Sequence, residues 1–150
     1  MIDFDTLVHK TRNDKFIPIT TLALDPGDTT GIAVFSGTEL VHAEEVMGDH
    51  ATMAGLFNRF QPTVVVAEEY RIYETHARVH IHSTVPTLRL IGGIEMLCHL
   101  SAIPLYMYGA GRHKPFSTDD KLKAWGFYQN TYRHANDAIR VGMYHIIFGE

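Results

Sequence analysis

Four side chains that could bind divalent metal ions lie in three distant segments of the chain. Asp25 follows a short apolar run, Glu68 ends a second apolar run, and His134 and Asp137 lie three residues apart near the carboxyl end. Carboxylate oxygens bind hard divalent ions, which activate water and stabilise the charge that develops on a phosphate during hydrolysis. These residue types and positions predict metal-dependent chemistry on a phosphate group.

Each residue of this set also has a purely structural interpretation. Asp25 precedes Pro-Gly and could cap a turn, and Glu68 could be a surface charge at a strand end. His134 and Asp137 could cap the amino end of a helix, where a carboxylate also meets a favourable dipole. The occurrence of all four residues together favours the metal interpretation.

The pattern of apolar residues and turn residues predicts an α/β domain. Strands are expected at residues 20–25, 32–35, 40–46, 64–68 and 105–108, and helices at 51–60, 86–100 and 134–148. Pro86 falls in the first turn of the second helix, where proline is tolerated. Residues 109–123 are expected to form a basic loop. Residues 1–18 are taken as an extension without an assigned place, and residues 19–150 as the domain itself.

Length and composition agree with one cytoplasmic domain. A chain of 150 residues, 45% hydrophobic, has room for one core that buries roughly 70% of the unfolded surface. Its one cysteine, Cys98, lies in an apolar run, excludes a disulfide framework and is expected to be a small buried hydrophobe. No apolar stretch reaches about 20 residues, and the polar start does not resemble a signal peptide, so neither a membrane span nor secretion is predicted.

The net charge of −4 would seem to argue against a nucleic-acid partner. Acidic residues, however, crowd the first fifty positions, whereas residues 71–140 are net basic. Such asymmetry indicates a surface that faces a polyanion. Carboxylates that hold metal ions would also be neutralised, so the formal charge overstates the repulsion.

A mixed sheet whose strand ends carry Asp25 and Glu68, facing a helix with His134 and Asp137, would form one site, because helical residues three apart share a face. The motifs resemble the RuvC family of Holliday-junction resolvases, in the RNase H-like superfamily, over residues 20–148. The similarity is closest to compact phage-type members, in which the glutamate is followed by an acidic residue and an aromatic one. The residues that carry the resemblance are Asp25-Pro26-Gly27, Gly31, Glu68-Glu69-Tyr70 and His134-x-x-Asp137-Ala138.

The resemblance implies an RNase H-like (RuvC-type) mixed sheet flanked by helices and a homodimer that makes paired nicks in a four-way DNA junction. It implies two Mg²⁺ ions, replaceable by Mn²⁺, and no small-molecule cofactor. Asp25 would bridge both ions, Glu68 would hold one, and Asp137 with His134 the other. Motif alignment and the alternation of side chains along a strand favour Glu68 over Glu69 as the ligand.

Basic residues near this site are expected to contact DNA. Lys114 or Lys121, in the segment where the family keeps basic residues, would steady the scissile phosphate, and the sequence does not decide between them. An aromatic residue just past the glutamate, Tyr70 or Tyr73, would lie near the point of strand exchange, although neither aligns without a shift. The expected DNA-binding residues are Arg71, Tyr73, Arg78, Arg112, Lys114 and Lys121.

A histidine-rich stretch at residues 74–82 allows two interpretations. His76, His80 and His82 could bind zinc, but no cysteine ligands accompany them. The stretch alternates polar and apolar residues, which is typical of an extended segment. We therefore expect a mobile loop that touches DNA beside the active site.

Other function classes fit the sequence less well. The segment Asp25-x-Gly-x-Thr-Thr-Gly is similar to the first phosphate loop of actin-like ATPases and sugar kinases, but those proteins need two lobes. A binding protein without catalysis would not need the intact set of ligands. A monomeric nuclease of the same fold that cuts flaps, other branched DNA or RNA-DNA hybrids remains the main alternative. The apolar face of the 86–100 helix, with Leu88, Leu90, Ile94 and Leu97, could be either core or dimer interface.

Overall fold

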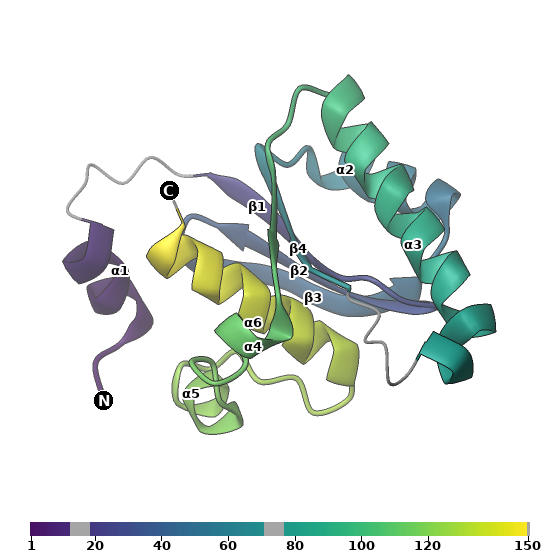
Figure 1. The fold of residues 1–150 in the computed structure, drawn as a ribbon. Coiled ribbons are helices and arrows are strands. Elements are labelled where there is room, and N and C mark those ends of the chain that lie inside the picture. Colours follow the sequence, from purple (N-terminus) through teal and green to yellow (C-terminus); the bar gives the residue numbers. More distant parts are fainter. Residues whose placement is uncertain (13–18, 71–76, 150) are drawn as a thin grey trace.

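The computed structural model describes the backbone of residues 1–12, 19–70 and 77–149, and the side chains of residues 1–8, 19–70 and 86–149. Its centre is a five-stranded mixed sheet in the order β3-β2-β1-β4-β5 (Figure 1). The first three strands pair antiparallel, whereas β1–β4 and β4–β5 pair in parallel. The strands are β1 (Thr20–Asp25), β2 (Thr29–Ser36), β3 (Glu39–Met47), β4 (Val64–Glu68) and β5 (Leu105–Tyr108).

Helices cover both faces of the sheet. Helices α2 (His50–Phe60) and α3 (Ala77–Leu100) lie on one face (Figure 1). The long helix α6 (Arg133–Phe148) lies on the other, together with α1 (Phe4–Arg12), α4 (Ala110–His113) and α5 (Asp119–Ala124). A strand covered on both faces is apolar at successive positions, which explains the continuous apolar runs of β1 and β4. The predicted α/β architecture is confirmed.

Alternate residues of β1 and β4 enter two separate cores. Leu22, Leu24 and Val65 pack toward α2 and α3. Ala23 and Val66 pack toward α6. Cys98 is 3% exposed in the first of these cores, as expected for a small hydrophobe. No helix in the described ranges is long and apolar enough to cross a membrane.

Helix α6 lies unusually close to the sheet at Gly142. A β-carbon at this position would be 2.7 Å from the ring of Phe35 and 3.0 Å from the β-carbon of Ala23. The first of these distances is shorter than real β-carbons show and the second is tight, so any larger residue at position 142 would push the helix or the Phe35 ring away. The close packing fixes the axis of α6, and with it the place where the helix begins.

Helix α1, in the segment that the sequence left unplaced, packs against the core beneath α6. Phe4 is 5% and Val8 is 1% exposed. The Phe4 ring contacts Phe35 of β2 and the rings of Trp125 and Phe127. The segment therefore belongs to the same hydrophobic core as the sheet.

Residues 109–123 are not the loop that we predicted, because they contain α4 and α5. Thr118 caps α5 by accepting a hydrogen bond from the amide of Lys121. Asp119 and Asp120 occupy the first turn, where carboxylates interact favourably with the helix dipole. A cap followed by two acidic residues is a helix start, and the basic character of the segment obscured it.

Helix α3 begins at Ala77 rather than at Pro86, so the expectation of an extended segment is wrong for residues 77–82. The buried positions 87, 90, 94 and 98 follow a helical repeat. Continued toward the amino end, this repeat reaches His80, Ser83 and Thr84, which are polar. Apolar periodicity is therefore missing from the first part of the helix. Residues 74–76 lie outside the described residues.

Candidate active site

Asp25 and Glu68 lie side by side at one edge of the sheet. β1 and β4 run in parallel with Leu24 opposite Ala67, so the next residue of each strand is one of the two carboxylates. Their side chains are 15% and 17% exposed, which is low for acidic groups. Two carboxylates this buried repel each other unless cations compensate them.

The amino end of α6 brings His134 to these carboxylates. His134 Nδ1 lies 3.1 Å from Asp25 Oδ2. The backbone amide of His134 donates to Glu45 Oε1 of β3 at 2.8 Å, while the side chain of Tyr132, the N-cap residue, makes no cap hydrogen bond. Glu45 thus satisfies one of the free amides at this helix end. Sequence analysis missed Glu45, because only the fold brings β3 next to α6.

Asp137, one turn further along α6, is held by two cations. Its Oδ1 accepts from Arg140 Nη1 at 2.8 Å, and its Oδ2 lies 3.6 Å from Lys114 Nζ. The same Lys114 Nζ lies 3.7 Å from Glu68 Oε1. The ammonium group therefore lies between the carboxylates of Glu68 and Asp137.

Arg140 links α6 to the segment between α4 and α5. Besides Asp137, it contacts Asp119 and donates from Nε to the carbonyl of Ser117 at 2.9 Å. Its side chain is 13% exposed. In the sequence, Arg140 contributes to the basic charge of residues 71–140, and no local signal identifies its partners.

Of the two candidate lysines, the structure brings Lys114 to the site. Lys121 Nζ instead donates to the carbonyl of Phe116 at 2.7 Å and lies 4.0 Å from the centre of the Phe116 ring. Lys121 is therefore engaged within its own segment. Arg112, one of the expected DNA-binding residues, is exposed on α4.

A buried histidine that we did not predict completes the surroundings of Glu68. His113 is 0% exposed, and its Nε2 lies 3.0 Å from Glu68 Oε2. The angle between the two groups is outside the range of a hydrogen bond. His113, the last residue of α4, and Lys114, its C-cap residue, therefore contact the two different oxygens of one carboxylate.

The pKa values of the two strand-end carboxylates shift in opposite directions. Burial, followed by repulsion from Glu68, raises the pKa of Asp25 to about 6, although His134 opposes the shift. Burial would also raise the pKa of Glu68, but the contact with His113 and the charge of Lys114 outweigh burial and hold this pKa below its usual value. Asp25 is therefore the group that gains most from a cation placed beside it.

The donor set fits a hard divalent ion. The set consists of three carboxylates and one imidazole, with His134 beside Asp25 and Lys114 Nζ between Glu68 and Asp137. Oxygen ligands with a single nitrogen suit Mg²⁺ and Mn²⁺. Within the described residues, no three Asp, Glu, His or Cys side chains converge tightly enough to enclose an ion, so the ligands would have to close in when one binds.

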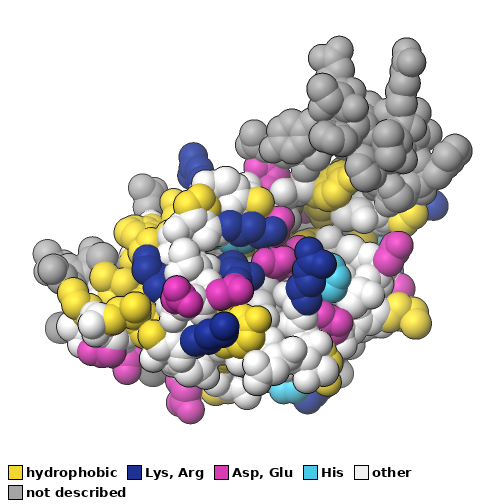
Figure 2. All heavy atoms as spheres, turned by 90° about the horizontal axis from the view of Figure 1, so that it is seen from below, with side chains coloured by type: hydrophobic (Ala, Val, Ile, Leu, Met, Phe, Trp, Pro, Cys, Tyr) yellow, Lys and Arg dark blue, Asp and Glu magenta, His cyan; other side chains and the backbone are white. Residues whose placement is uncertain are grey.

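The surface around the site carries both signs of charge. Figure 2 shows Lys and Arg side chains beside and between Asp and Glu side chains on the face seen from below. Arg71, Tyr73 and His76 lie outside the described residues. Arg78 lies within α3, but its side chain is outside the described part, as are those of His80 and His82, so the DNA contacts and the zinc alternative stay predictions.

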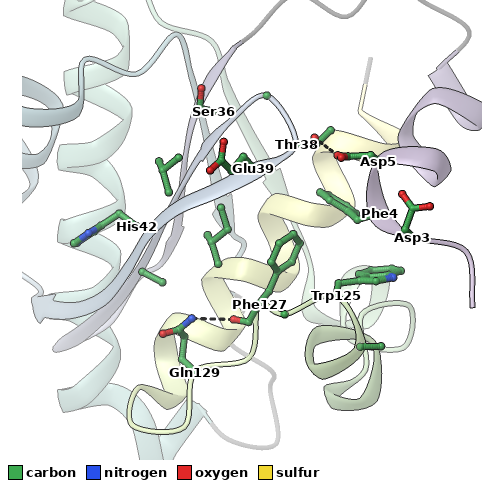
Figure 3. A pocket seen from close by; sticks show the side chains of 16 residues that line it. Asp3, Phe4, Asp5, Ser36, Thr38, Glu39, His42, Trp125, Phe127 and Gln129 are labelled. Atoms are coloured by element: carbon green, nitrogen blue, oxygen red, sulfur yellow. Dashed lines mark hydrogen bonds between the residues drawn. The ribbon is translucent and has the colours of Figure 1, made fainter.

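A separate groove lies along the edge strand β3, between the β2–β3 turn, α1 and the segment after α5 (Figure 3). Phe4, Trp125 and Phe127 supply aromatic rings, and Asp5 accepts a hydrogen bond from Thr38 at its rim. None of the four predicted metal ligands lines this groove. It is therefore distinct from the candidate active site.

The fold is that of RuvC-type resolvases. The chain is similar to Thermus thermophilus RuvC in complex with a Holliday junction substrate, with a TM-score of 0.69 and 18% identity over 87% of this chain and 94% of the other. It is also similar to the yeast mitochondrial Holliday junction resolvase Ydc2, with a TM-score of 0.57 and 12% identity over 95% of this chain and 86% of the other. A third similar structure is the fowlpox virus resolvase in complex with Holliday junction DNA. Its TM-score is 0.58, and the identity is 16% over 84% of this chain and 97% of the other.

No family model matches the chain, and no curated protein does so. The structural similarity confirms the predicted RNase H-like (RuvC-type) fold.

Proposed function

We propose that this protein is a metal-dependent, structure-specific endodeoxyribonuclease that resolves four-way (Holliday) DNA junctions by paired nicking. The observation that carries the proposal is that Glu68, His134 and Asp137 all lie near Asp25 at one edge of a RuvC-type sheet. Structures with the same fold include resolvases in complex with junction DNA. The net basic span of residues 71–140 supports a DNA partner.

The four residues would divide the work of binding two Mg²⁺ ions, or Mn²⁺ in their place. Asp25, which lies beside Glu68 and His134, would hold both ions, Glu68 would hold one, and His134 with Asp137 would hold the other. When bound, the ions would activate the attacking water and stabilise charge on the scissile phosphate. His134 would bind through a neutral ring nitrogen, with Nδ1 facing Asp25 at 3.1 Å.

Among the described residues, Lys114 is the cation that we propose contacts the scissile phosphate. Its Nζ is 3.7 Å from Glu68 Oε1 and 3.6 Å from Asp137 Oδ2, and its side chain is 43% exposed. An ion shared by these carboxylates would compete with the ammonium group for the same oxygens. The lysine side chain, released from them, is long enough to turn toward a phosphate on the exposed side.

Resolution of a junction requires two active sites, because the two equivalent strands are related by a twofold axis. Helix α3 carries apolar side chains that the described fold leaves exposed. Leu88 is 43%, Met96 56% and Leu100 75% exposed, whereas Leu90 and Ile94 are 2% and 1% exposed in the core. The first three lie at intervals of four and eight residues and so share one side of the helix. This side of α3 supports a homodimer.

A comparison of labelled substrates tests the function. A four-way junction, a flap, a plain duplex and an RNA-DNA hybrid are incubated with the protein in Mg²⁺, with Asp137→Asn as the inactive control. We expect paired nicks, symmetric about the branch point, that leave 5′-phosphate ends sealed by ligase. Preferred cutting of the flap or the hybrid by a monomer would replace the resolvase assignment with that alternative.

A further inference from the structure

His113 is a fully buried polar side chain whose burial needs an explanation. It is 0% exposed, and neither Nδ1 nor Nε2 makes a hydrogen bond within the described parts of the chain. Leaving buried polar groups without hydrogen bonds is unfavourable. An apolar side chain would avoid this cost if the position served packing alone. A role for the imidazole is therefore to be sought in its contact with another group.

The group that faces His113 is the carboxylate of Glu68. Nε2 lies 3.0 Å from Glu68 Oε2, and this oxygen is itself buried without a hydrogen bond. A small rotation of the ring or the carboxylate satisfies both atoms at once. Oε1, the other oxygen of Glu68, lies on the side of Lys114 and Asp137. Glu68 therefore has one oxygen toward the protein interior and one toward the candidate metal site.

We propose that His113 is a positioning residue that holds Glu68 by Oε2, so that Glu68 offers only Oε1 to a divalent ion. The proposal rests on the proposed function in one respect, which is that Glu68 is a metal ligand. The imidazole donates a hydrogen bond from Nε2–H to Oε2. This hydrogen bond holds the carboxylate in one orientation, with Oε1 toward the candidate metal site.

The placement of His113 makes this restraint effective. α4 is a short helix that packs against α6, and the amide of Ser117 donates to the His113 carbonyl at 2.9 Å. α6 also carries Asp137, and Arg140 ties Asp137 to the carbonyl of Ser117. His113, which contacts Glu68, and Arg140, which contacts Asp137, are thus both linked to the backbone of Ser117. Groups that orient metal ligands typically contribute 10–100-fold to metal affinity or activity.

The test measures the Mn²⁺ affinity of two variants of His113 and does not depend on cleavage alone. His113→Gln can keep an N–H donor near the position of Nε2, whereas His113→Met fills the volume without a donor. The affinity for Mn²⁺ is measured in the absence of DNA from the electron paramagnetic resonance signal of the free ion. We expect His113→Met to lower this affinity about 10-fold or more and His113→Gln to stay within about 3-fold of the unsubstituted chain.

His42→Met is the matched control. His42 Nε2 also lies 3.0 Å from a glutamate oxygen, that of Glu44, but it contacts Phe60 on the side of α2. This substitution should leave the Mn²⁺ affinity unchanged. Thermal unfolding of every variant without ions shows whether the fold is retained, and junction binding without divalent ions should be the same in all of them.

Two results overturn the proposal. The first is an unchanged Mn²⁺ affinity in His113→Met. The second is an equal loss of affinity in the Gln and Met variants together with an equal drop in melting temperature, which would show a role in packing only. A chain that binds Mn²⁺ with the expected pattern but does not cut junctions would contradict the proposed substrate and leave this inference standing. A chain that binds no Mn²⁺ contradicts both.

Discussion

Gly31 lies directly against the backbone of His134. A β-carbon at position 31 would be 1.9 Å from the carbonyl oxygen of His134 and 2.7 Å from the amide nitrogen of Ala135. Gly31 also pairs with Asp25 across β1 and β2. The absence of a side chain at position 31 of β2 is thus what allows the first turn of α6 to reach Asp25.

Substitution of Gly31 by alanine should therefore damage the site more than the fold. The added β-carbon would meet backbone atoms, which cannot rotate away, so the start of α6 must move and carry His134 with it. We expect a loss of about 1–3 kcal/mol in the free energy of unfolding and a loss of cleavage of at least about 100-fold. Gly55→Ala is the control, because no atom lies within 4 Å of a β-carbon there. In the interior of α2 it should stabilise by about 0.5–1 kcal/mol and leave cleavage unchanged.

Asp25→Asn should stabilise the ion-free protein while abolishing cleavage. The pKa of Asp25 is raised to about 6 in the folded state, against about 3.9 in an unfolded chain. Well below pH 4 the carboxyl is protonated in both states and has no effect. As the pH rises to 6, only the unfolded state ionises freely, so the folded state loses about 2–3 kcal/mol and does not regain it at higher pH. The amide avoids this loss.

The measurement is the free energy of unfolding of both chains without divalent ions at pH 4 and pH 8. The stabilising effect of Asp25→Asn should be complete at pH 8 and much smaller at pH 4. Junction binding should be retained, because the substitution also removes a negative charge that repels phosphate. Full turnover by this variant in Mg²⁺ would disprove the metal mechanism.

Glu68→Gln should abolish cleavage, whereas Glu69→Gln should keep most of it. Glu68 contacts Lys114 and His113 and is the carboxylate that acts most strongly on Asp25. Glu69 follows the strand, and its amide donates to the Tyr108 carbonyl at 2.9 Å. Rates of junction nicking at saturating Mg²⁺ decide between the two. An inactive Glu69→Gln beside an active Glu68→Gln would exchange their roles.

Much of this architecture could be predicted because strands covered on both faces read as apolar runs that proline and glycine interrupt. β1 ends before Pro26, Pro62 separates α2 from β4, and Pro104 precedes β5. The positions of Asp25 and Glu68 at strand ends followed directly from these runs. The pattern does not give the parallel pairing of β1 with β4 that sets the two residues side by side.

The supports of the site could not be predicted, because they depend on contacts between distant segments. Glu45 reaches His134 across 89 positions, and Arg140 reaches Asp119 across 21. Nothing local distinguishes His113 from the other histidines of the chain. The choice between Lys114 and Lys121 required the fold as well, since α4 and α5 direct the two side chains to different partners.

Mg²⁺ and Mn²⁺ should support cleavage, and Ca²⁺ should permit binding with little chemistry. The ligands are hard oxygens with one imidazole, and Ca²⁺ prefers more ligands at longer distances. Ion binding must displace protons from Asp25, so the apparent affinity for Mn²⁺ should fall as the pH drops below about 6. Titration of the chelated protein with each ion at pH 5.5 and 7.5 measures both effects. Cleavage that survives exhaustive chelation would contradict the prediction.

The last prediction concerns the exposed side of α3 and separates a resolvase from a monomeric nuclease of the same fold. Leu88→Glu with Met96→Glu places two charges where a second copy would pack, while the buried face with Leu90 and Ile94 is unchanged. Sedimentation should show a dimer for the unsubstituted chain at micromolar concentration and a monomer for the double variant. The variant should retain its melting behaviour and still nick single strands, but the two nicks should no longer occur in one binding event. Val41→Glu, on the edge strand β3 and 51% exposed in the monomer, should leave the dimer intact. A double variant that stays dimeric would place the interface elsewhere, and an unsubstituted chain that stays monomeric on a junction would favour the flap or hybrid nuclease.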